Sequence, residues 1–140
     1  MFYGEFDYKV DEKGRIPIPP RFRNVLKDLV LTAGAEKCIT AYTLTEWKKI
    51  AALLTGSSLT RSKIRKLNRV LFATAFSTRI DGQGRIALPA PLREHAGITD
   101  EVVIAGANTY LEIWDKSLWE EEKNNSQAQA WQIIESLENR

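Results

Sequence analysis

Two short stretches of the sequence place an aspartate, a glycine and an arginine at the same spacing. The first reads "DEKGRIPIPPRFR", and the second, seventy positions later, reads "DGQGRIALPAPLR". Each opens on an Asp that an Arg follows four residues later, which gives the pairs Asp11–Arg15 and Asp81–Arg85. A guanidinium held by a carboxylate presents a planar fork of donors that matches a phosphate or a guanine edge. The same pair could instead only fix the neck of a turn, where an exposed ion pair stabilises by about 0–1 kcal/mol.

The two stretches differ in the basic residues that accompany the Asp–Arg pair. The first carries Lys13 and Arg21, whereas the second has Gln83 and Pro91 at the matching positions. Arg23 adds a further positive charge at the end of the first stretch. The first stretch is therefore the stronger candidate for a surface that binds anions.

The similarity between the two stretches extends along the chain as an internal repeat. Downstream of the motif it resumes at an offset of 72, where Gly34 matches Gly106 and Trp47 matches Trp119. Each half is therefore one copy of a unit of roughly fifty residues, which is too small to enclose much of a core alone. Two copies can bury their apolar faces against each other, which predicts a pseudo-twofold arrangement.

Each copy has the same predicted order of elements, beginning with a hairpin and a helix. Alternating apolar residues over 6–10 predict a strand, and "RIPI" after the "DEKG" turn predicts a second strand whose prolines place it at an edge or end it early. Pro20 suits the first turn of a helix that would carry Phe22, Leu26 and Leu29.

Two further strands and a helix complete the copy. The strands are predicted around "VLTAG" and "CITAYT", and Thr43 with Glu46 has the spacing of a capping box for a helix through Leu54. The second copy repeats this order as a hairpin over residues 79–88, a short helix ending near Gly97, strands over 102–105 and 110–114, and a helix from Asp115.

The segment between the copies is basic. Apolar residues from Leu59 to Leu71 keep a helical spacing, and Ser58 or Thr60 could cap the helix. Five basic residues crowd it, namely Arg61, Lys63, Arg65, Lys66 and Arg69. They form either a solvated helix face or a face that contacts phosphate.

These observations predict an α+β fold in four parts. Residues 1–55 and 76–123 are the two copies, and residues 56–75 are the basic connecting helix. Residues 124–140 form an acidic C-terminal tail that is predicted to be helical around 131–137.

The net charge of +2 conceals an uneven distribution. Residues 1–93 hold 17 Lys and Arg against 8 Asp and Glu, whereas residues 94–140 hold 3 against 10. A basic body is compatible with a phosphate-rich partner, although solvated helix faces of opposite sign would give the same count.

The composition is that of a globular chain rather than a membrane protein. Apolar residues make up 44% of the 140 residues and charged residues 27%. No apolar run approaches the ~20 residues of a membrane span, and the first ten residues do not resemble a signal peptide. A single cysteine, Cys38, cannot form an internal disulfide. We therefore expect a cytoplasmic protein with no membrane partner.

Side chains suited to catalysis are few. His95 is the only histidine and Cys38 the only cysteine, and the sequence has neither the spacing of a metal site nor a serine–histidine–aspartate set. We expect no enzymatic activity, no metal and no cofactor. Trp47 and Trp119 occupy matching repeat positions, so we expect them to pack rather than to stack on bases.

Three stretches carry a resemblance to a known family. The opening "MFYGEFDYKVDEKGRIPIPPRFR", the second "DGQGRIALPAPLREHAGI" and "LEIWDKSLWEEE" resemble the MraZ family of bacterial transcriptional regulators, and the likeness covers residues 1–123. It implies a tandem of swapped-hairpin units, related to the AbrB-type DNA-binding domain, that form a small β-barrel flanked by helices. It further implies ring-like homo-oligomers at the nucleoid that bind repeated boxes of double-stranded DNA upstream of the division and cell-wall gene cluster.

The same resemblance and the basic neighbours point to the DNA-facing side chains. They are Asp11, Lys13, Arg15, Arg21, Arg23, Asp81 and Arg85. Arg15 would read a base while the lysine and the other arginines of the first copy position the protein on phosphates. The second copy lacks these neighbours, so Arg85 is expected to contribute less than Arg15.

Two other classes of function are open to the sequence. The chain could be an oligomeric scaffold whose Asp–Arg pairs only fix hairpin necks. It could also inhibit another protein through its acidic tail, residues 124–140.

Overall fold

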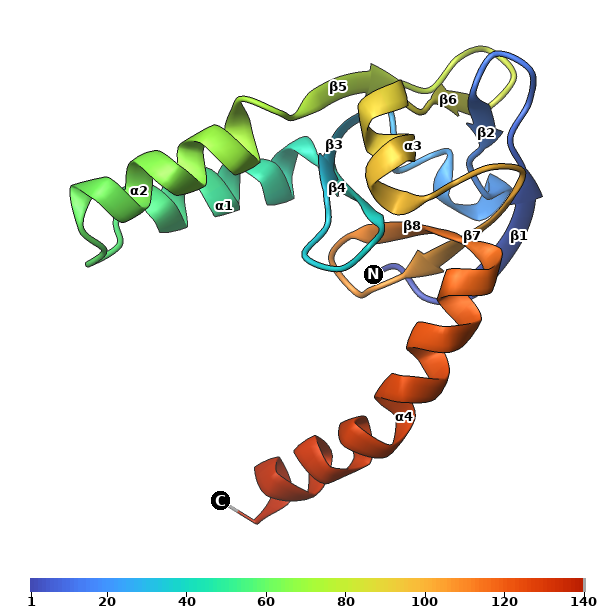
Figure 1. Cartoon of the computed structure of the whole chain (residues 1–140). Coiled ribbons are helices and arrows are strands. Elements are labelled where there is room, and N and C mark those ends of the chain that lie inside the picture. Colours follow the sequence, from blue (N-terminus) through green and yellow to red (C-terminus); the bar gives the residue numbers. More distant parts are fainter. Residues whose placement is uncertain (140) are drawn as a thin grey trace.

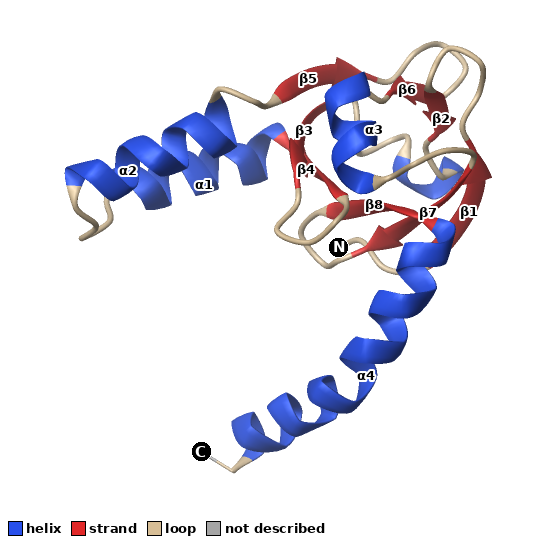
Figure 2. Cartoon of the chain, in the orientation of Figure 1, coloured by secondary structure: helices blue, strands red, loops and turns tan. Residues whose placement is uncertain are grey.

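The computed structural model of the chain describes residues 1–139 as an α+β fold (Figures 1 and 2). The elements of the first copy are β1 (Glu5–Lys9), β2 (Arg15–Pro17), the 3₁₀ turn η1 (Pro20–Phe22), β3 (Asp28–Ala33), β4 (Ile39–Thr43) and α1 (Leu44–Thr55). The connection holds α2 (Arg61–Leu67) and the π-helical turn η2 (Asn68–Phe72). The second copy comprises β5 (Phe76–Arg79), β6 (Arg85–Ala87), α3 (Ala90–Ala96), β7 (Glu101–Gly106), β8 (Leu111–Asp115) and α4 (Lys116–Glu138).

Strand pairing interleaves the two copies. Six strands form one antiparallel sheet in the order β1-β7-β8-β4-β3-β5, and β2 pairs with β6 in a second, two-stranded sheet. Thus β1 of the first copy pairs with β7 of the second, and β5 of the second pairs with β3 of the first. The first strand of each copy is therefore held by the other copy.

The predicted closed barrel is wrong, although the predicted α+β class is confirmed. In the described chain β1 and β5 are the two edges of an open sheet, and no ladder joins them. The short strands β2 and β6 contact these edges but pair only with each other. Each is three residues long, and Pro17 lacks the N–H that a longer ladder would need.

The centre of the core lies where the two copies meet. Ile16 of β2 faces Ile86 of β6 across the two-stranded sheet, and their side chains are 0% and 1% exposed. Further repeat positions are buried in the same cluster, among them Ile18 and Leu88, and Phe22 and Leu92. The apolar face of each copy is therefore covered by the apolar face of the other.

The helix predicted from Pro20 through Leu29 is wrong in its extent. Only the 3₁₀ turn η1 forms there, and β3 begins at Asp28. Leu29 pairs with Thr43 of β4 on one side and with Thr78 of β5 on the other. The hydrogen bonds of these two ladders outweigh the helical spacing of the apolar residues in the local sequence. The matching segment of the second copy does form a helix, α3, which ends at Gly97 with a positive φ of 63°.

The other helices begin at the capping residues that the sequence indicates. The hydroxyl of Thr43 accepts the N–H of Glu46 at the start of α1, and that of Thr60 accepts the N–H of Lys63 at the start of α2. After Asp115, one continuous helix of 23 residues replaces the helix expected at the end of the second copy and the separate helical stretch expected around 131–137 in the tail.

The helices extend from the sheet as two arms. Figure 1 shows α1 and α2 on one side of the body and α4 on another, while α3 covers the curved sheet. Trp47 of α1 packs against Tyr42 and Phe72, with ring centroids 5.7 and 4.8 Å apart. Among the described residues no helix is both long and apolar enough to span a bilayer.

Burial at the meeting of the two copies predicts a stability cost. Replacing Ile16 with Ala removes buried methyl groups, so we expect Ile16→Ala to lower the free energy of unfolding by about 2–5 kcal/mol. Val25, which is 68% exposed, supplies the control, because Val25→Ala should change stability by no more than about 0.5 kcal/mol. Urea unfolding followed by circular dichroism measures both, and equal stability of the two variants would contradict the assignment of the core.

Candidate nucleic-acid interface

The turn between β1 and β2 is held by one carboxylate. Oδ1 of Asp11 accepts the backbone N–H groups of Lys13 and Arg15, each at 2.9 Å. Oδ2 of the same carboxylate accepts Nε–H of Arg15 at 2.8 Å. The aspartate therefore shapes the turn and orients the guanidinium at the same time, so the structural and functional interpretations of the pair are compatible.

The turn between β5 and β6 repeats this arrangement. Oδ1 of Asp81 accepts the N–H groups of Gln83 and Arg85 at 2.9 Å, and Oδ2 accepts Nε–H of Arg85 at 3.0 Å. The side chains of Arg15 and Arg85 are 28% and 27% exposed. Both arginine side chains are thus partly buried and keep part of their surface exposed.

Hydrogen bonds to the two turn carboxylates favour their charged form. The backbone N–H of Arg15 is the main cause that lowers the pKa of Asp11, and the N–H of Arg85 does the same for Asp81. Both carboxylates are therefore ionised at neutral pH. Each turn keeps a charged partner for its arginine throughout the physiological range.

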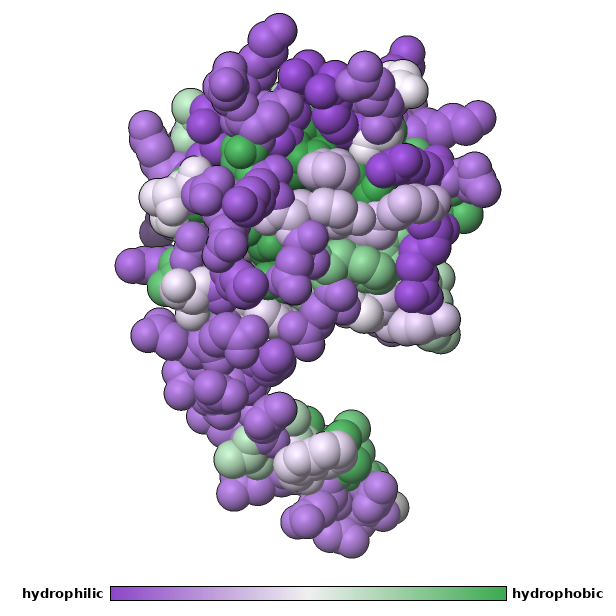
Figure 3. All heavy atoms as spheres, turned by 90° about the vertical axis from the view of Figure 1, so that its right-hand side faces the viewer, coloured by the Kyte–Doolittle hydropathy of each residue, from purple (hydrophilic) through white to green (hydrophobic). Residues whose placement is uncertain are grey.

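Pairing of β2 with β6 brings the two turns together. Ile18 donates its N–H to the carbonyl of Gly84, and Leu88 donates to the carbonyl of Gly14, both at 2.8 Å. Nη1 of Arg85 lies 3.9 Å from Oδ2 of Asp11, so Arg85 is near the carboxylates of both copies. Figure 1 shows the two turns side by side at one end of the molecule, and Figure 3 shows that end as mostly hydrophilic.

Each turn is also supported by an arginine of the other copy. Gly84 has a φ of +78° and is buried against the Arg23 guanidinium, which a Cβ at this position would overlap. Arg23 is held there because its Nε–H donates to the carbonyl of Ile18 at 2.8 Å. Gly14, with a φ of +76°, lies in the same way over Arg93.

Sequence reasoning missed Arg93. The signal was available, because Arg93 is the repeat counterpart of Arg23. In the structure Arg93 supports the turn at Gly14 and Arg23 supports the turn at Gly84. Arg23 therefore has a positioning role in addition to any contact it makes with a ligand.

The remaining predicted residues of the first copy lie in different surroundings. Lys13 is exposed on the turn, and no ion pair holds it among the described residues. Arg21 is exposed too, but its guanidinium lies 4.3 Å above the ring centroid of Tyr3 in a cation–π contact. Six of the seven predicted residues therefore lie at the paired turns, and the seventh, Arg21, lies on the ring of Tyr3.

The basic residues of α2 and η2 are not part of the turn surface. All five of them, from Arg61 to Arg69, are exposed. Figure 1 places α2 at the far end of one arm, on the other side of the body from β2 and β6. Any contact that these residues make with a phosphate is thus separate from the turns.

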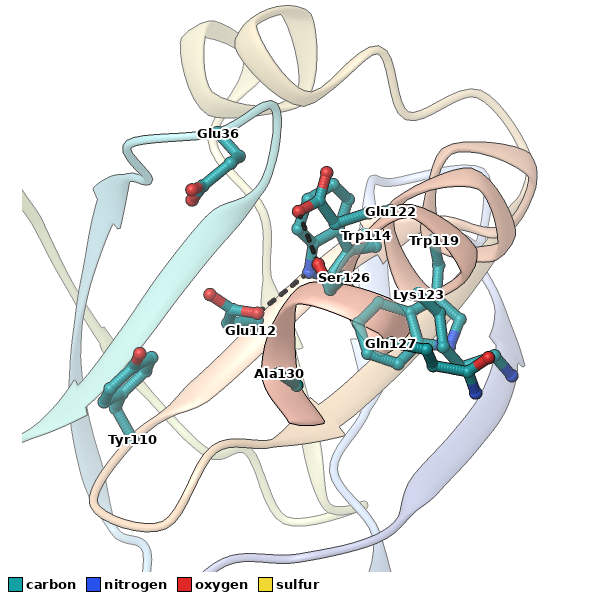
Figure 4. Close-up of a pocket in the computed structure, with 10 residues that line it drawn as sticks. All are labelled: Glu36, Tyr110, Glu112, Trp114, Trp119, Glu122, Lys123, Ser126, Gln127 and Ala130. Carbon is teal, nitrogen blue, oxygen red and sulfur yellow. Dashed lines mark hydrogen bonds between the residues drawn. The ribbon is translucent and has the colours of Figure 1, made fainter. Parts of the chain in front are cut away.

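The hollow beside α4 has the opposite electrostatic character. Glu36, Glu112 and Glu122 line it together with Trp114 and Trp119, as Figure 4 shows. Trp114 donates Nε1–H to Glu112 at 3.1 Å, while burial raises the pKa of that carboxyl. Three carboxyl groups against the single ammonium of Lys123 disfavour a phosphate in this hollow.

Cys38 and His95, the cysteine and the histidine of the chain, lie away from the paired turns. The buried thiol of Cys38 lies 3.9 Å from Oε2 of Glu112, and burial raises its pKa to about 12. A thiol with this pKa is not ionised at neutral pH and is a poor nucleophile. Nε2 of the exposed His95 lies 3.1 and 3.0 Å from the carbonyl oxygens of Gly34 and Glu36.

Comparison with known proteins identifies the family. The family model described as "MraZ protein, putative antitoxin-like" matches the chain twice, over residues 1–70 and 71–136. A protein named "Transcriptional regulator MraZ" from Dehalococcoides mccartyi is 60% identical over 140 residues, which cover 99% of each chain. Proteins of the same name from Thermoanaerobacter pseudethanolicus and Acetivibrio thermocellus are 43% and 41% identical, over 99% and 98% of this chain and 97% and 96% of their own.

The chain therefore belongs to the MraZ family, and the resemblance inferred from its sequence motifs is confirmed. The double match of the family model also agrees with the internal repeat. The relatives are named as regulators of transcription and not as enzymes.

The glycines of the second turn offer a matched test of the turn geometry. Gly84→Ala requires a strained left-handed backbone and displaces the Arg23 guanidinium, so we expect it to lower the free energy of unfolding by about 1–3 kcal/mol. A Cβ at Gly82 would meet nothing within 4 Å, so Gly82→Ala should cost much less. Chemical unfolding of both variants gives the comparison.

A second substitution separates overlap from backbone strain. Arg23→Ala removes the guanidinium that the new Cβ would overlap. In this background Gly84→Ala should lower the free energy of unfolding by less, because the backbone strain is its only remaining cost. If the changes in unfolding free energy of the two single variants simply added up in the double variant, Arg23 would not support the turn.

Proposed function

We propose that the chain is a sequence-specific DNA-binding regulator of transcription whose paired turns face the DNA. The observation that carries this proposal is the placement of two carboxylate-held arginines, Arg15 and Arg85, side by side at the paired turns, where each is partly exposed. The family membership and the names of the relatives support it. The charge balance of residues 1–93 supports a polyanionic partner.

The two kinds of basic residue have different tasks in this proposal. Arg15 presents a fork to a guanine edge in the major groove, and the hydrogen bond from Nε–H to Asp11 leaves the outer nitrogens free for that contact. Lys13 and Arg21 contact phosphates, which fixes the register of the protein on the duplex but carries no sequence information. Arg23 adds positive potential from beneath the second turn.

Exchange of strands between the copies supports the finer assignment of the fold. Because β1 and β5 each pair with a strand of the other copy, each copy can be described as a swapped-hairpin unit related to the AbrB-type domain. The corresponding boundaries, residues 1–55, 56–75, 76–123 and 124–140, are part of this proposal.

Assembly into a ring explains how a shallow surface can bind DNA with useful affinity. A pair of short turns offers few base contacts, but linking several copies makes each further contact intramolecular and raises the effective concentration. Short boxes repeated along double-stranded DNA are the partner that such a ring would recognise. We place these boxes upstream of the division and cell-wall gene cluster, and the protein at the nucleoid.

Binding through phosphate contacts predicts a strong dependence on salt. Each phosphate neutralised contributes about −0.9 to the slope of log K against log salt. Anisotropy of labelled upstream DNA, titrated with protein at several salt concentrations, measures this slope. A flat response would exclude an interface dominated by phosphate and would favour a scaffold that does not bind DNA.

Substitution of the two turn arginines distinguishes the two copies. The loss of one bidentate base contact costs about 1–3 kcal/mol, and in a ring the loss recurs in every engaged copy. We therefore expect Arg15→Ala to abolish measurable specific binding. Arg85→Ala should weaken binding much less, because Gln83 replaces the basic neighbour Lys13 and because Arg85 lies near two carboxylates rather than one.

Arg61→Ala is the matched control, because it removes one exposed positive charge from α2 instead of the turns. Its binding should fall only slightly. Circular dichroism and mass in solution establish that each variant is folded and assembled. If Arg85→Ala then lost binding as completely as Arg15→Ala, the two turns would contribute equally and the proposed difference between them would be wrong.

A further inference from the structure

Gln83 stands at the tip of the second turn, between two glycines. The backbone there is fixed, because the N–H of Gln83 donates to Oδ1 of Asp81 at 2.9 Å and the N–H of Gly84 donates to the carbonyl of Asp81 at 3.0 Å. The side chain itself is exposed, and among the described residues its amide forms no hydrogen bond. The turn therefore presents a free amide, donor and acceptor together, from a fixed backbone.

The surroundings of Gln83 leave room for a large partner. A Cβ at Gly82 would meet nothing within 4 Å, so the space on that side is open. Gly84, on the other side, is buried against the Arg23 guanidinium, which supports the turn from within. Pairing of β2 with β6 places this turn beside the first, as Figure 1 shows. Gln83 thus belongs to the same surface as Arg15.

Arg85, the other polar donor of the second turn, is more restrained than Gln83. Its Nε–H donates to Oδ2 of Asp81 at 3.0 Å, and its Nη1 lies 3.9 Å from Oδ2 of Asp11. Two carboxylates therefore compete with a base for the donors of Arg85. Gln83 carries no charge and has no such competitor, so it is the side chain of this turn that is freest to contact a base.

We propose that Gln83 reads adenine in the major groove and so determines one base of the DNA site. A primary amide combines an acceptor oxygen with an NH₂ donor. In the major groove adenine offers the matching pair, the acceptor N7 beside the donor N6–H₂, whereas guanine offers two acceptors. Gln83 therefore pairs with adenine through two hydrogen bonds. Lys13, at the equivalent position of the first turn, only donates and cannot form this pair.

This inference rests on the proposed function, because it requires that the paired turns face DNA. It goes further by giving the second turn a base of its own, which differs from the guanine edge assigned to Arg15. It also separates two kinds of contribution to binding. An uncharged amide neutralises no phosphate, so Gln83 contributes base preference without contributing to the salt dependence.

Selection from a pool of random-sequence DNA duplexes tests the assignment. We expect the parent to enrich a motif that contains an adenine and to prefer it over the other bases at that position by about 5- to 150-fold. Gln83→Ala should enrich the same motif with this one preference lost. In Gln83→Glu the carboxylate only accepts, so the preferred base at that position should change from adenine to cytosine, whose N4–H₂ donates.

Lys13→Ala is the matched comparison, because it changes the equivalent position of the first turn. The loss of a phosphate contact should weaken binding to all sequences alike, make the salt slope shallower by about 1 and keep the adenine in the motif. Both positions are exposed, so every variant should keep the fold, which circular dichroism checks.

The outcomes distinguish the role of Gln83 from DNA binding as such. A parent that enriches no motif would contradict sequence-specific binding, and the role of Gln83 with it. A parent motif without an adenine, or folded Gln83 variants that still select the adenine, would overturn the role of Gln83 alone and leave DNA binding by the paired turns in place.

Discussion

The fold depends on one constraint, which is that each copy of the repeat takes part of its strand pairing and part of its core from the other copy. The first strand of each copy finds a ladder only in the other copy, as β1 does on β7 and β5 on β3. The central residues Ile16 and Ile86 bury each other across the two-stranded sheet. Because of this dependence, the two turns lie side by side although seventy residues separate them in the chain.

The same dependence extends to the candidate interface. Arg23 fills the space under Gly84, and Arg93 fills the space under Gly14, so each turn rests on a side chain of the opposite copy. The turn at Gly84 therefore depends on a residue of the first copy, and the turn at Gly14 on a residue of the second. Both turns are thus fixed by side-chain contacts as well as by their own backbone hydrogen bonds.

Local signals in the sequence predicted the parts that depend on neighbouring residues. The turn carboxylates, the capping threonine Thr43 and the helix stop at Gly97 all act within a few residues, and the structure has them as expected. The failures concern distant partners. Leu29 joins β3 because strands from both copies flank it, and the sheet is open because β2 and β6 pair with each other instead of closing its edges. No local pattern reports such pairings, and the contact between Arg85 and Asp11 was missed for the same reason.

Joining two related units in one chain has a consequence for symmetry. A dimer of identical subunits must present the same residue twice, and its preferred DNA site is then an inverted repeat. In the tandem chain Lys13 and Gln83 occupy matching positions, and so do Arg21 and Pro91, which breaks the twofold relation at the surface while the core keeps it. In the proposed function, this asymmetry gives the bound chain a direction along the duplex, which an inverted repeat does not have.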